Sequence, residues 1–264
     1  MLASANGGME VEEAADVLRA SAAPSREGLE QATRDLAHRL GPDLGAPLAS
    51  AGRLLARLFL ELELTLLEIN PLFVQGDGSV VAGDVKLIAD DNALVRQPEL
   101  AALVRARRKA YPDAAFKLEH GFDLVVLNPE GEVGLVTTGA GLSMKLIDEM
   151  TRSGARPFNF LDIRTGQMRG SPERLILVLR RIAQGRKIRS VLVNIFAGIT
   201  DLGEFARLLI EALDAVPELD APLVVRLVGN GEEAAAALLE ACGRPMILEQ
   251  DLERAVALAV RVGA

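Results

Sequence analysis

The segment VLVNIFAGIT, residues 191–200, decides the fold class, because a nearly uninterrupted apolar run leads into a glycine turn. A second apolar run, LVVRLV, occupies residues 223–228. Strands of this kind are expected where helices cover both faces of a parallel sheet. Working outward from residues 191–200, short β-rich runs alternate with helical segments from about Leu118 to the C-terminus. This alternation predicts a doubly wound α/β sheet.

The predicted elements of this sheet follow one another at short intervals. We expect strands at 122–127, 133–137, 158–161, 190–195, 223–227 and 246–248, and helices at 142–153, 172–184, 203–215, 232–242 and 251–262. The turn sequence at residues 128–131, NPEG, predicts that the first two strands form a hairpin. A second turn sequence, YPD at 111–113, indicates two domains, residues 1–114 and 115–264. In the first domain we expect helices at 28–40 and 46–62.

Two junctions between a strand and a helix contain glycine. They are TTGAGL, residues 137–142, and NIFAGIT, residues 194–200. Glycine lets a ligand approach the backbone, and the free amides and dipole of a helix N-terminus favour an anion. Close packing of a strand against a helix explains a single glycine turn about as well. Two such turns in one sheet favour phosphate or carboxylate binding.

A hairpin is predicted for LEINPLFVQGDGSVVAGDVKL, residues 67–87, around the tight loop Gly76-Asp77-Gly78. This register places Asn70 opposite Asp84 and Glu68 opposite Lys86. Because side chains alternate along a strand, all four project from one face. The other face is apolar and is expected to be core; it carries Leu67, Ile69, Phe73, Val81, Val85 and Leu87.

The polar face of this hairpin suits a hard cation. An amide oxygen opposite a carboxylate, with a second carboxylate two residues away, matches Mg²⁺ that also holds nucleotide phosphates. The alternative is a cross-strand Glu68–Lys86 ion pair beside a polar Asn70–Asp84 contact on a solvated face.

Composition excludes several classes of protein. The chain has 264 residues and a net charge of −8, which argues against nucleic acid or an anionic membrane as its main partner. The single cysteine, Cys242, and the two separated histidines support neither a disulfide framework nor a thiolate or histidine metal cluster. No apolar run reaches membrane-spanning length, and the first residues do not form a signal peptide. We therefore expect a cytoplasmic protein.

Seven segments together resemble the β subunit of succinate–CoA ligase and related nucleotide-dependent acid–thiol ligases. They are MLASANGGMEVEE, LLEINPLFV, GDVKLIADDNALVRQPEL, TTGAGLSMKLID, FNFLDI, VLVNIFAGIT and VVRLVGN, in family order along essentially the whole chain. The resemblance implies part of an ATP-grasp domain followed by a flavodoxin-like CoA-ligase domain. It also implies a reaction that joins a carboxylic acid to CoA through an acyl phosphate. The phosphoryl group is carried by a phosphohistidine on a partner α subunit, which also holds the CoA site.

The resemblance assigns roles to particular residues of this chain. Asn70 and Asp84 would bind Mg²⁺ and the phosphates of ATP or GTP, and Glu68 would orient the partner's histidine. Gly139, Ala140, Gly141 and Leu142 at the helix start would cradle the phosphohistidine. Thr138, Gly198, Ile199 and Thr200 would border the acid.

The chain departs from the family pattern at three positions and at its start. Thr138 replaces an asparagine, Ala197 replaces a glycine, and Arg164 lies where the family has a glycine run and adds a guanidinium that could pair with a carboxylate. These changes argue against succinate and for a different or larger acid. The alternative for Arg164 is an ordinary surface residue in a loop. The first half of the ATP-grasp domain has no counterpart before Met1, so we expect a fragment or one part of a split subunit. The alternative is a non-catalytic, truncated subunit that pairs with an α-like CoA-binding protein; the intact set Glu68, Asn70 and Asp84 favours an enzyme.

Overall fold

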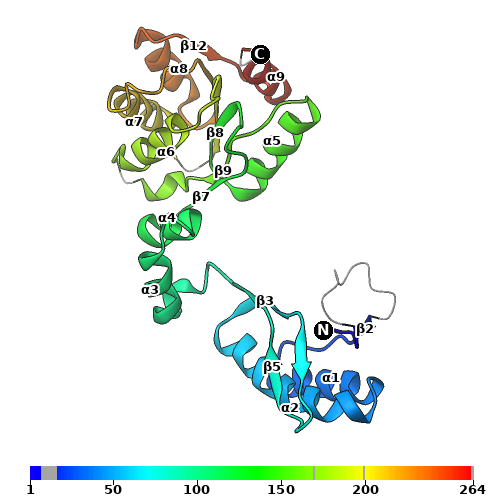
Figure 1. The fold of residues 1–264 in the computed structure, drawn as a ribbon. Helices are drawn as coiled ribbons and strands as arrows, with labels where there is room; N and C mark the ends of the chain where they lie inside the picture. The colour runs from blue at the N-terminus through cyan, green and yellow to red at the C-terminus, as the bar shows by residue number, and fades with distance from the viewer. Residues whose placement is uncertain (7–16, 169, 199, 263–264) are drawn as a thin grey trace. The chain divides into compact units, whose positions relative to one another are not determined.

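The computed structural model of the chain describes residues 1–6, 17–168, 170–198 and 200–262 (Figure 1). These residues form two compact units, Met1–Ala106 and Arg107–Ala264, and each is described by itself. The predicted domain boundary between residues 114 and 115 falls inside helix α4, Pro112–His120.

The first unit contains two long helices and short antiparallel strand pairs. The amphipathic helices α1 and α2 pack against each other, and Ser25 caps α1 by accepting the Gly28 N–H at 3.1 Å. The elements are β1 (Leu2–Ala3), β2 (Leu18–Arg19), α1 (Arg26–Arg39), α2 (Pro42–Glu61), β3 (Leu64–Ile69), β4 (Leu72–Val74), β5 (Val80–Ala82), β6 (Val85–Ala89), η1 (Leu94–Arg96) and α3 (Pro98–Ala106). The two helices predicted for this unit are confirmed.

The predicted register of the hairpin is also confirmed. Strand β3 pairs with β6 and β4 with β5, both antiparallel, with Glu68 opposite Lys86 and Phe73 opposite Val81. The Gln75 N–H donates to the Ser79 oxygen at 2.9 Å, which closes the three-residue loop. Gly78 has φ +81°, a left-handed value that favours glycine.

The prediction that the apolar face of the hairpin is core is wrong for four of its six residues, whereas Leu67 and Ile69 are half-buried. The other four side chains, Phe73, Val81, Val85 and Leu87, are between 45% and 54% exposed. Alternation alone cannot reveal whether a face has a packing partner, so the pattern did not predict the exposure of these four side chains.

The second unit is the predicted doubly wound sheet, and each element that was predicted lies within two residues of its predicted bounds; the helix at Pro112–His120 and the 3-10 helix at Thr165–Gln167 were not predicted. The elements are α4 (Pro112–His120), β7 (Asp123–Val126), β8 (Val133–Thr137), α5 (Ala140–Arg152), β9 (Asn159–Asp162), η2 (Thr165–Gln167), α6 (Glu173–Ala183), β10 (Ser190–Ala197), α7 (Leu202–Asp214), β11 (Leu223–Gly229), α8 (Glu232–Ala241), β12 (Met246–Leu248) and α9 (Leu252–Val262). Strands β8, β10, β11 and β12 are parallel, in the order β12-β11-β10-β8.

The predicted hairpin between the first two strands of this unit is wrong. The turn at residues 128–131 does form, but β7 pairs antiparallel with β9. Strand β9 lies alongside β8 on its other side, because the Phe158 N–H donates to the Val133 oxygen at 2.8 Å. The Asn159 side chain completes the junction, since its amide both accepts from Leu135 N–H and donates to Leu135 O, each at 2.9 Å.

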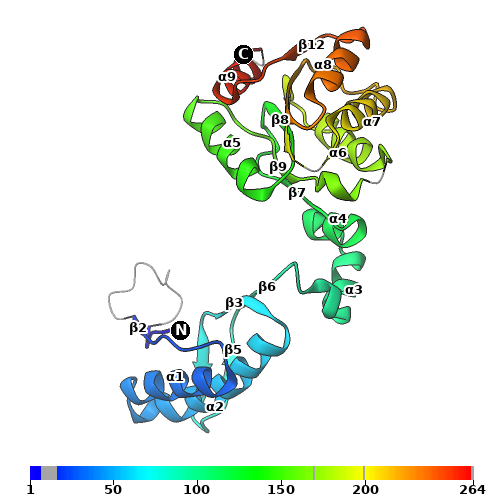
Figure 2. The same cartoon turned by 180° about the vertical axis from the view of Figure 1, so that it is seen from behind.

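Helices cover both faces of the sheet. Figures 1 and 2 show α5 and α9 on one face and α6, α7 and α8 on the other. Along β10, Val191, Val193 and Ile195 are buried under the second group, whereas Leu192 is buried under the first. With β9 included, the parallel strands run in the order β9-β8-β10-β11-β12, which is the flavodoxin-like order. Within the described part of the chain, none of the helices combines the length and apolar character that crossing a membrane requires.

Candidate functional site

The hairpin of the first unit brings two of the predicted site residues opposite each other. The Asn70 N–H donates to the Asp84 main-chain oxygen at 3.2 Å, and both residues lie between the β3–β6 and β4–β5 ladders. Glu68 lies two residues before Asn70, within β3 and opposite Lys86. The alternative considered from the sequence, a Glu68–Lys86 ion pair, is not formed, although the two residues are in register.

The chemistry of this face fits a magnesium–nucleotide complex better than a metal ion held by protein alone. The Asp84 side chain is exposed, and its carboxylate accepts the Val85 N–H at 2.9 Å. In the part of the chain that the structure describes, no three His, Cys, Asp or Glu side chains are grouped to hold a metal. Mg²⁺ is commonly bound through one or two carboxylates, with substrate phosphates and water supplying the other ligands. Asp84 has one such carboxylate, and Asn70 has an amide oxygen that Mg²⁺ can also accept as a ligand.

In the second unit, the predicted residues lie at the carboxyl ends of the parallel strands. The helix that follows β8 packs on one face of the sheet, and the helix that follows β10 packs on the other. The edge between β8 and β10 is therefore the topological switch point, where open α/β sheets bind ligands. Two loops leave this point, one at residues 138–139 before α5 and the other after β10, where Gly198, Thr200 and Asp201 are described.

The loop after β8 exposes main-chain amides at the start of a thirteen-residue helix. Gly139 has φ +87° and ψ +118°, a combination that requires glycine, and a Cβ at Gly139 or Gly141 would meet nothing within 4 Å. The helical hydrogen bonds begin with Ser143 N–H donating to Gly139 O at 3.0 Å. The amides of Ala140, Gly141 and Leu142 precede that bond and point out of the helix start. The first turn of α5 has no acidic residue, so nothing in that turn opposes an anion.

The loop after β10 is connected to the loop after β9. The Thr200 and Thr165 hydroxyl oxygens are 3.0 Å apart, and Gly198 is exposed with open space where a Cβ would be. Asp201 caps α7 by accepting the Glu204 N–H at 2.8 Å. Ile199, which was predicted to border the acid, lies outside the described residues.

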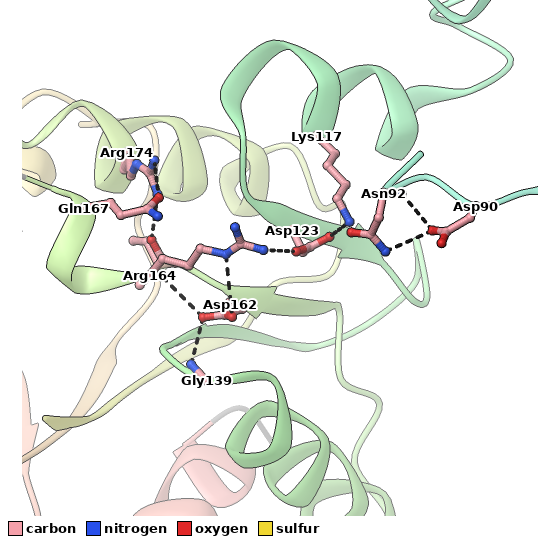
Figure 3. Close-up of polar contacts among 10 residues, drawn as sticks. Asp90, Asn92, Lys117, Asp123, Gly139, Asp162, Arg164, Gln167 and Arg174 are labelled. Carbon is pink, nitrogen blue, oxygen red and sulfur yellow. Dashed lines mark hydrogen bonds and ion pairs between the residues drawn. The ribbon is translucent and has the colours of Figure 1, made fainter. Parts of the chain in front are cut away.

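Sequence reasoning missed a carboxylate beside the glycine loop. Asp162, at the end of β9, accepts the Gly139 N–H at 2.8 Å through Oδ1 (Figure 3). The Arg164 guanidinium, predicted to lie near the acid, donates to Asp123 at 3.0 Å and is 3.9 Å from Asp162. The sequence did contain one indication of this role. Asp162 directly follows the predicted strand at residues 158–161, which places Asp162 at the carboxyl end of the sheet, where the glycine loop also lies.

Two polar side chains lie buried below the switch point. Thr137 on β8 and Asn194 on β10 are in register, and both are fully buried. Asn194 Oδ1 accepts from Arg226 on β11 at 3.1 Å. Thr137 Oγ1 and Asn194 Nδ2 have no hydrogen-bond partner among the described residues. Buried polar atoms are usually satisfied, so these two retain capacity to bind water or a ligand atom.

The chain is similar to known acid–CoA ligases. A CoA-ligase family model matches residues 136–260. The succinate–CoA ligase [ADP-forming] β subunit of Chloroflexus aurantiacus is 41% identical over 251 residues, which cover 90% of this chain and 63% of that protein. The corresponding subunit of Chloroflexus aggregans is 37% identical and covers 98% and 69% of the two chains.

The fold is also found in a solved structure. The ATP citrate lyase of Methanothrix soehngenii, determined in complex with citrate and coenzyme A, superposes with a TM-score of 0.66 at 19% identity, covering 98% of this chain and 68% of that one. At that identity the similarity concerns the fold alone. The chain spans slightly less than two thirds of the length of the C. aurantiacus relative. Identity at this level over nearly the whole chain shows that it belongs to the succinate–CoA ligase β-subunit family.

Proposed function

We propose that the chain forms the phosphate- and acid-handling part of an NDP-forming acid–CoA ligase. The observation that carries the proposal is the glycine loop at the switch point, whose amides face outward at a helix start with no acidic residue in its first turn. Such a helix start binds a phosphoryl or carboxylate group through its N–H donors and its dipole. Membership of the succinate–CoA ligase β-subunit family connects that anion to acyl-CoA formation.

In this reaction the terminal phosphoryl group of ATP or GTP passes to a histidine of the α subunit, and NDP leaves. The histidine then gives the phosphoryl group to the carboxylate of the acid. The CoA sulfur attacks the resulting acyl phosphate, and inorganic phosphate leaves. The CoA site and the histidine belong to the partner, so the chain contributes orientation and charge stabilisation.

The hairpin residues would serve the nucleotide end of this sequence. Asn70 and Asp84 would hold Mg²⁺, which neutralises nucleotide phosphates when it is bound. Glu68 lies two residues before Asn70, within β3. From there its carboxylate would orient the partner's histidine by accepting an N–H from the imidazole ring.

The second unit would serve the acid end. The amides from Gly139 to Leu142 would hold the phosphohistidine. Thr138, Gly198, Ile199 and Thr200 would border the acid, and the Thr200–Thr165 contact would fix the hydroxyl that faces it. Thr138 offers a hydroxyl and a methyl group, so the pocket would differ in shape and polarity from one lined by an amide.

The proposal is tested by isolating the chain from its native host with whatever chains bind it. The complex is incubated with Mg²⁺, labelled ATP or GTP, CoA and a panel of carboxylic acids. We expect an acid-labile phosphohistidine on a co-purifying chain and a CoA thioester whose yield depends on the acid. A complex that neither labels a histidine nor forms a thioester would overturn the proposal and favour a purely structural subunit.

The metal role is tested within the same complex by Asp84→Asn. Asp77→Asn is the matched control, because it removes the same charge from the loop of the same hairpin. We expect Asp84→Asn to lower histidine labelling at least about tenfold, a loss of about 1.4 kcal/mol, and to raise the Mg²⁺ concentration required. Equal labelling in the two variants would refute the assignment of Asp84.

A further inference from the structure

The carboxylate of Asp162 accepts hydrogen bonds from the backbone of two loops, one of which is the glycine loop. Its Oδ1 accepts the Gly139 N–H at 2.8 Å and the Arg164 N–H at 3.3 Å (Figure 3). One oxygen therefore joins the loop after β8 to the loop after β9. The Gly139 amide is used in this contact, and it precedes the three amides that point outward from the helix start.

A carboxylate in this place opposes the binding of an anion unless its charge is balanced. The Arg164 guanidinium provides that balance, because Nη2 donates to Asp123 at 3.0 Å and Nε is 3.9 Å from Asp162. Lys117 pairs with Asp123 from its other side at 2.5 Å. Asp123 and Asp162 thus face Arg164 and Lys117, and removal of the Arg164 guanidinium takes away the cation that lies 3.9 Å from Asp162.

The backbone around Arg164 is held firmly in place. Arg164 has φ +52°, a left-handed value that is uncommon for a residue other than glycine. Arg174 donates to the Ile163 oxygen and to Gln167 Oε1, both at 3.1 Å, and its guanidinium lies over the Phe122 ring. Burial and, to a lesser degree, the charge of Arg164 lower the pKa of Arg174. The local structure therefore fixes a cation at a strained position next to Asp162.

We propose that Asp162 and Arg164 are positioning residues for the anion that binds at the start of α5: Asp162 anchors Gly139, and Arg164 cancels the charge of Asp162. This inference rests on the proposed function for the identity of the anion, a phosphoryl group. It gives Arg164 a different task from pairing with the carboxylic acid, because its guanidinium is already bound to a carboxylate of this chain.

The test measures how tightly inorganic phosphate binds to the full chain. The readout is the shift of the amide resonances of residues 139–142 in NMR spectra as phosphate is added. Arg164→Gln removes the balancing charge, and we expect phosphate to bind about fivefold more weakly, as for one partly screened neighbouring charge. The double variant Asp162→Asn with Arg164→Gln removes both charges but keeps an oxygen that accepts the Gly139 N–H. We expect its phosphate affinity to return to within about twofold of the unaltered chain.

The anchor is tested separately by Asp162→Ala, which removes the acceptor. We expect this variant to shift the Gly139 resonance before phosphate is added and to bind phosphate more weakly than Asp162→Asn. Arg152→Gln is the matched control, because it removes an equal charge at the far end of α5, where Arg152 pairs with Glu149 at 2.7 Å. We expect this control to leave phosphate affinity unchanged.

Two results would overturn the inference. One is an unchanged phosphate affinity in Arg164→Gln, and the other is an unchanged Gly139 resonance and affinity in Asp162→Ala. Circular dichroism of each variant shows whether it has folded, and the isosteric Asp162→Asn with Arg164→Gln covers the case in which Asp162→Ala does not fold. Phosphate binding requires no partner, so the inference can hold even where the isolated complex shows no ligase activity, and the two failures are distinguishable.

Discussion

Two glycines at the start of α5, where an anion is proposed to bind, are expected to respond in opposite directions to the same substitution. Gly139 has φ +87° and ψ +118°, whereas Gly141 lies within the first turn of α5 and has no positive φ. A Cβ would meet nothing within 4 Å at either position. Steric crowding therefore contributes at neither site, and the backbone conformation alone decides the sign of the effect.

The magnitudes follow from that difference. Gly139→Ala places an L-residue in a region that is nearly restricted to glycine, which costs about 1–3 kcal/mol. Gly141→Ala removes backbone entropy from the unfolded chain and is expected to stabilise by about 0.5–1 kcal/mol. For a unit of this size, 1 kcal/mol moves the unfolding temperature by about 2–4 °C. We therefore expect Gly139→Ala to lower the transition temperature and Gly141→Ala to raise it.

Differential scanning calorimetry is the suitable assay, because the chain has no tryptophan and folds as two units. The transition of the second unit carries the effect, and that of the first unit serves as an internal control. Gly141→Ala should at the same time weaken phosphate binding, since its methyl group would occupy open space at the helix start where the anion is proposed to bind. A Gly139→Ala variant as stable as the unaltered chain would refute the conformational argument.

Three further predictions concern stability. Phe73→Ala should lower the free energy of unfolding of its unit in urea by less than about 1 kcal/mol, because its side chain is 54% exposed. Leu146→Ala should lower that of the other unit by about 2–5 kcal/mol, because Leu146 is fully buried. Equal losses would contradict the exposure of Phe73. Asn159→Ala should destabilise the second unit by about 2–3 kcal/mol, since it leaves a buried main-chain N–H and C=O unpaired, and a loss within the error of urea unfolding would contradict that role. The hydrogen bond from Arg156 lowers the pKa of Glu132, so this pair stabilises the fold above the unfolded-state pKa, and the contribution is lost as pH falls through the lower folded-state pKa. Glu132→Gln should therefore reduce the loss of stability at acid pH, measured as the unfolding temperature against pH. An unchanged acid dependence would exclude the pair as its source.

Local patterns predicted the elements and part of the site. The run from Thr137 to Leu142 marks a strand, a glycine turn and a helix within six residues, and all three are found where expected. The hairpin register follows from alternation, because a shift by one residue would mix polar and apolar faces. Neither inference needs information from a distant part of the chain.

The features that sequence missed depend on distant contacts. A turn sequence at residues 128–131 is compatible with a hairpin. It is equally compatible with a turn whose two flanking strands pair with other strands. The choice depends on Asn159, whose amide bonds to a strand twenty-four residues earlier. The exposure of Phe73 likewise depends on whether another element covers it. Local periodicity contains neither kind of information.

The order of the strands creates the charge arrangement at the proposed anion site. If β7 paired with β8, as the turn sequence suggested, that edge of β8 would be occupied and β9 could not lie beside it. Asp162 would then be separated from Gly139 by a strand, because neighbouring strands are about 4.8 Å apart and the observed contact is 2.8 Å. The Asn159 contacts place β9 next to β8, and Asp123 at the start of antiparallel β7 comes opposite Asp162. Two carboxylates consequently meet at the end of the sheet where an anion is proposed to bind, which explains why a fixed guanidinium, Arg164, is needed between them.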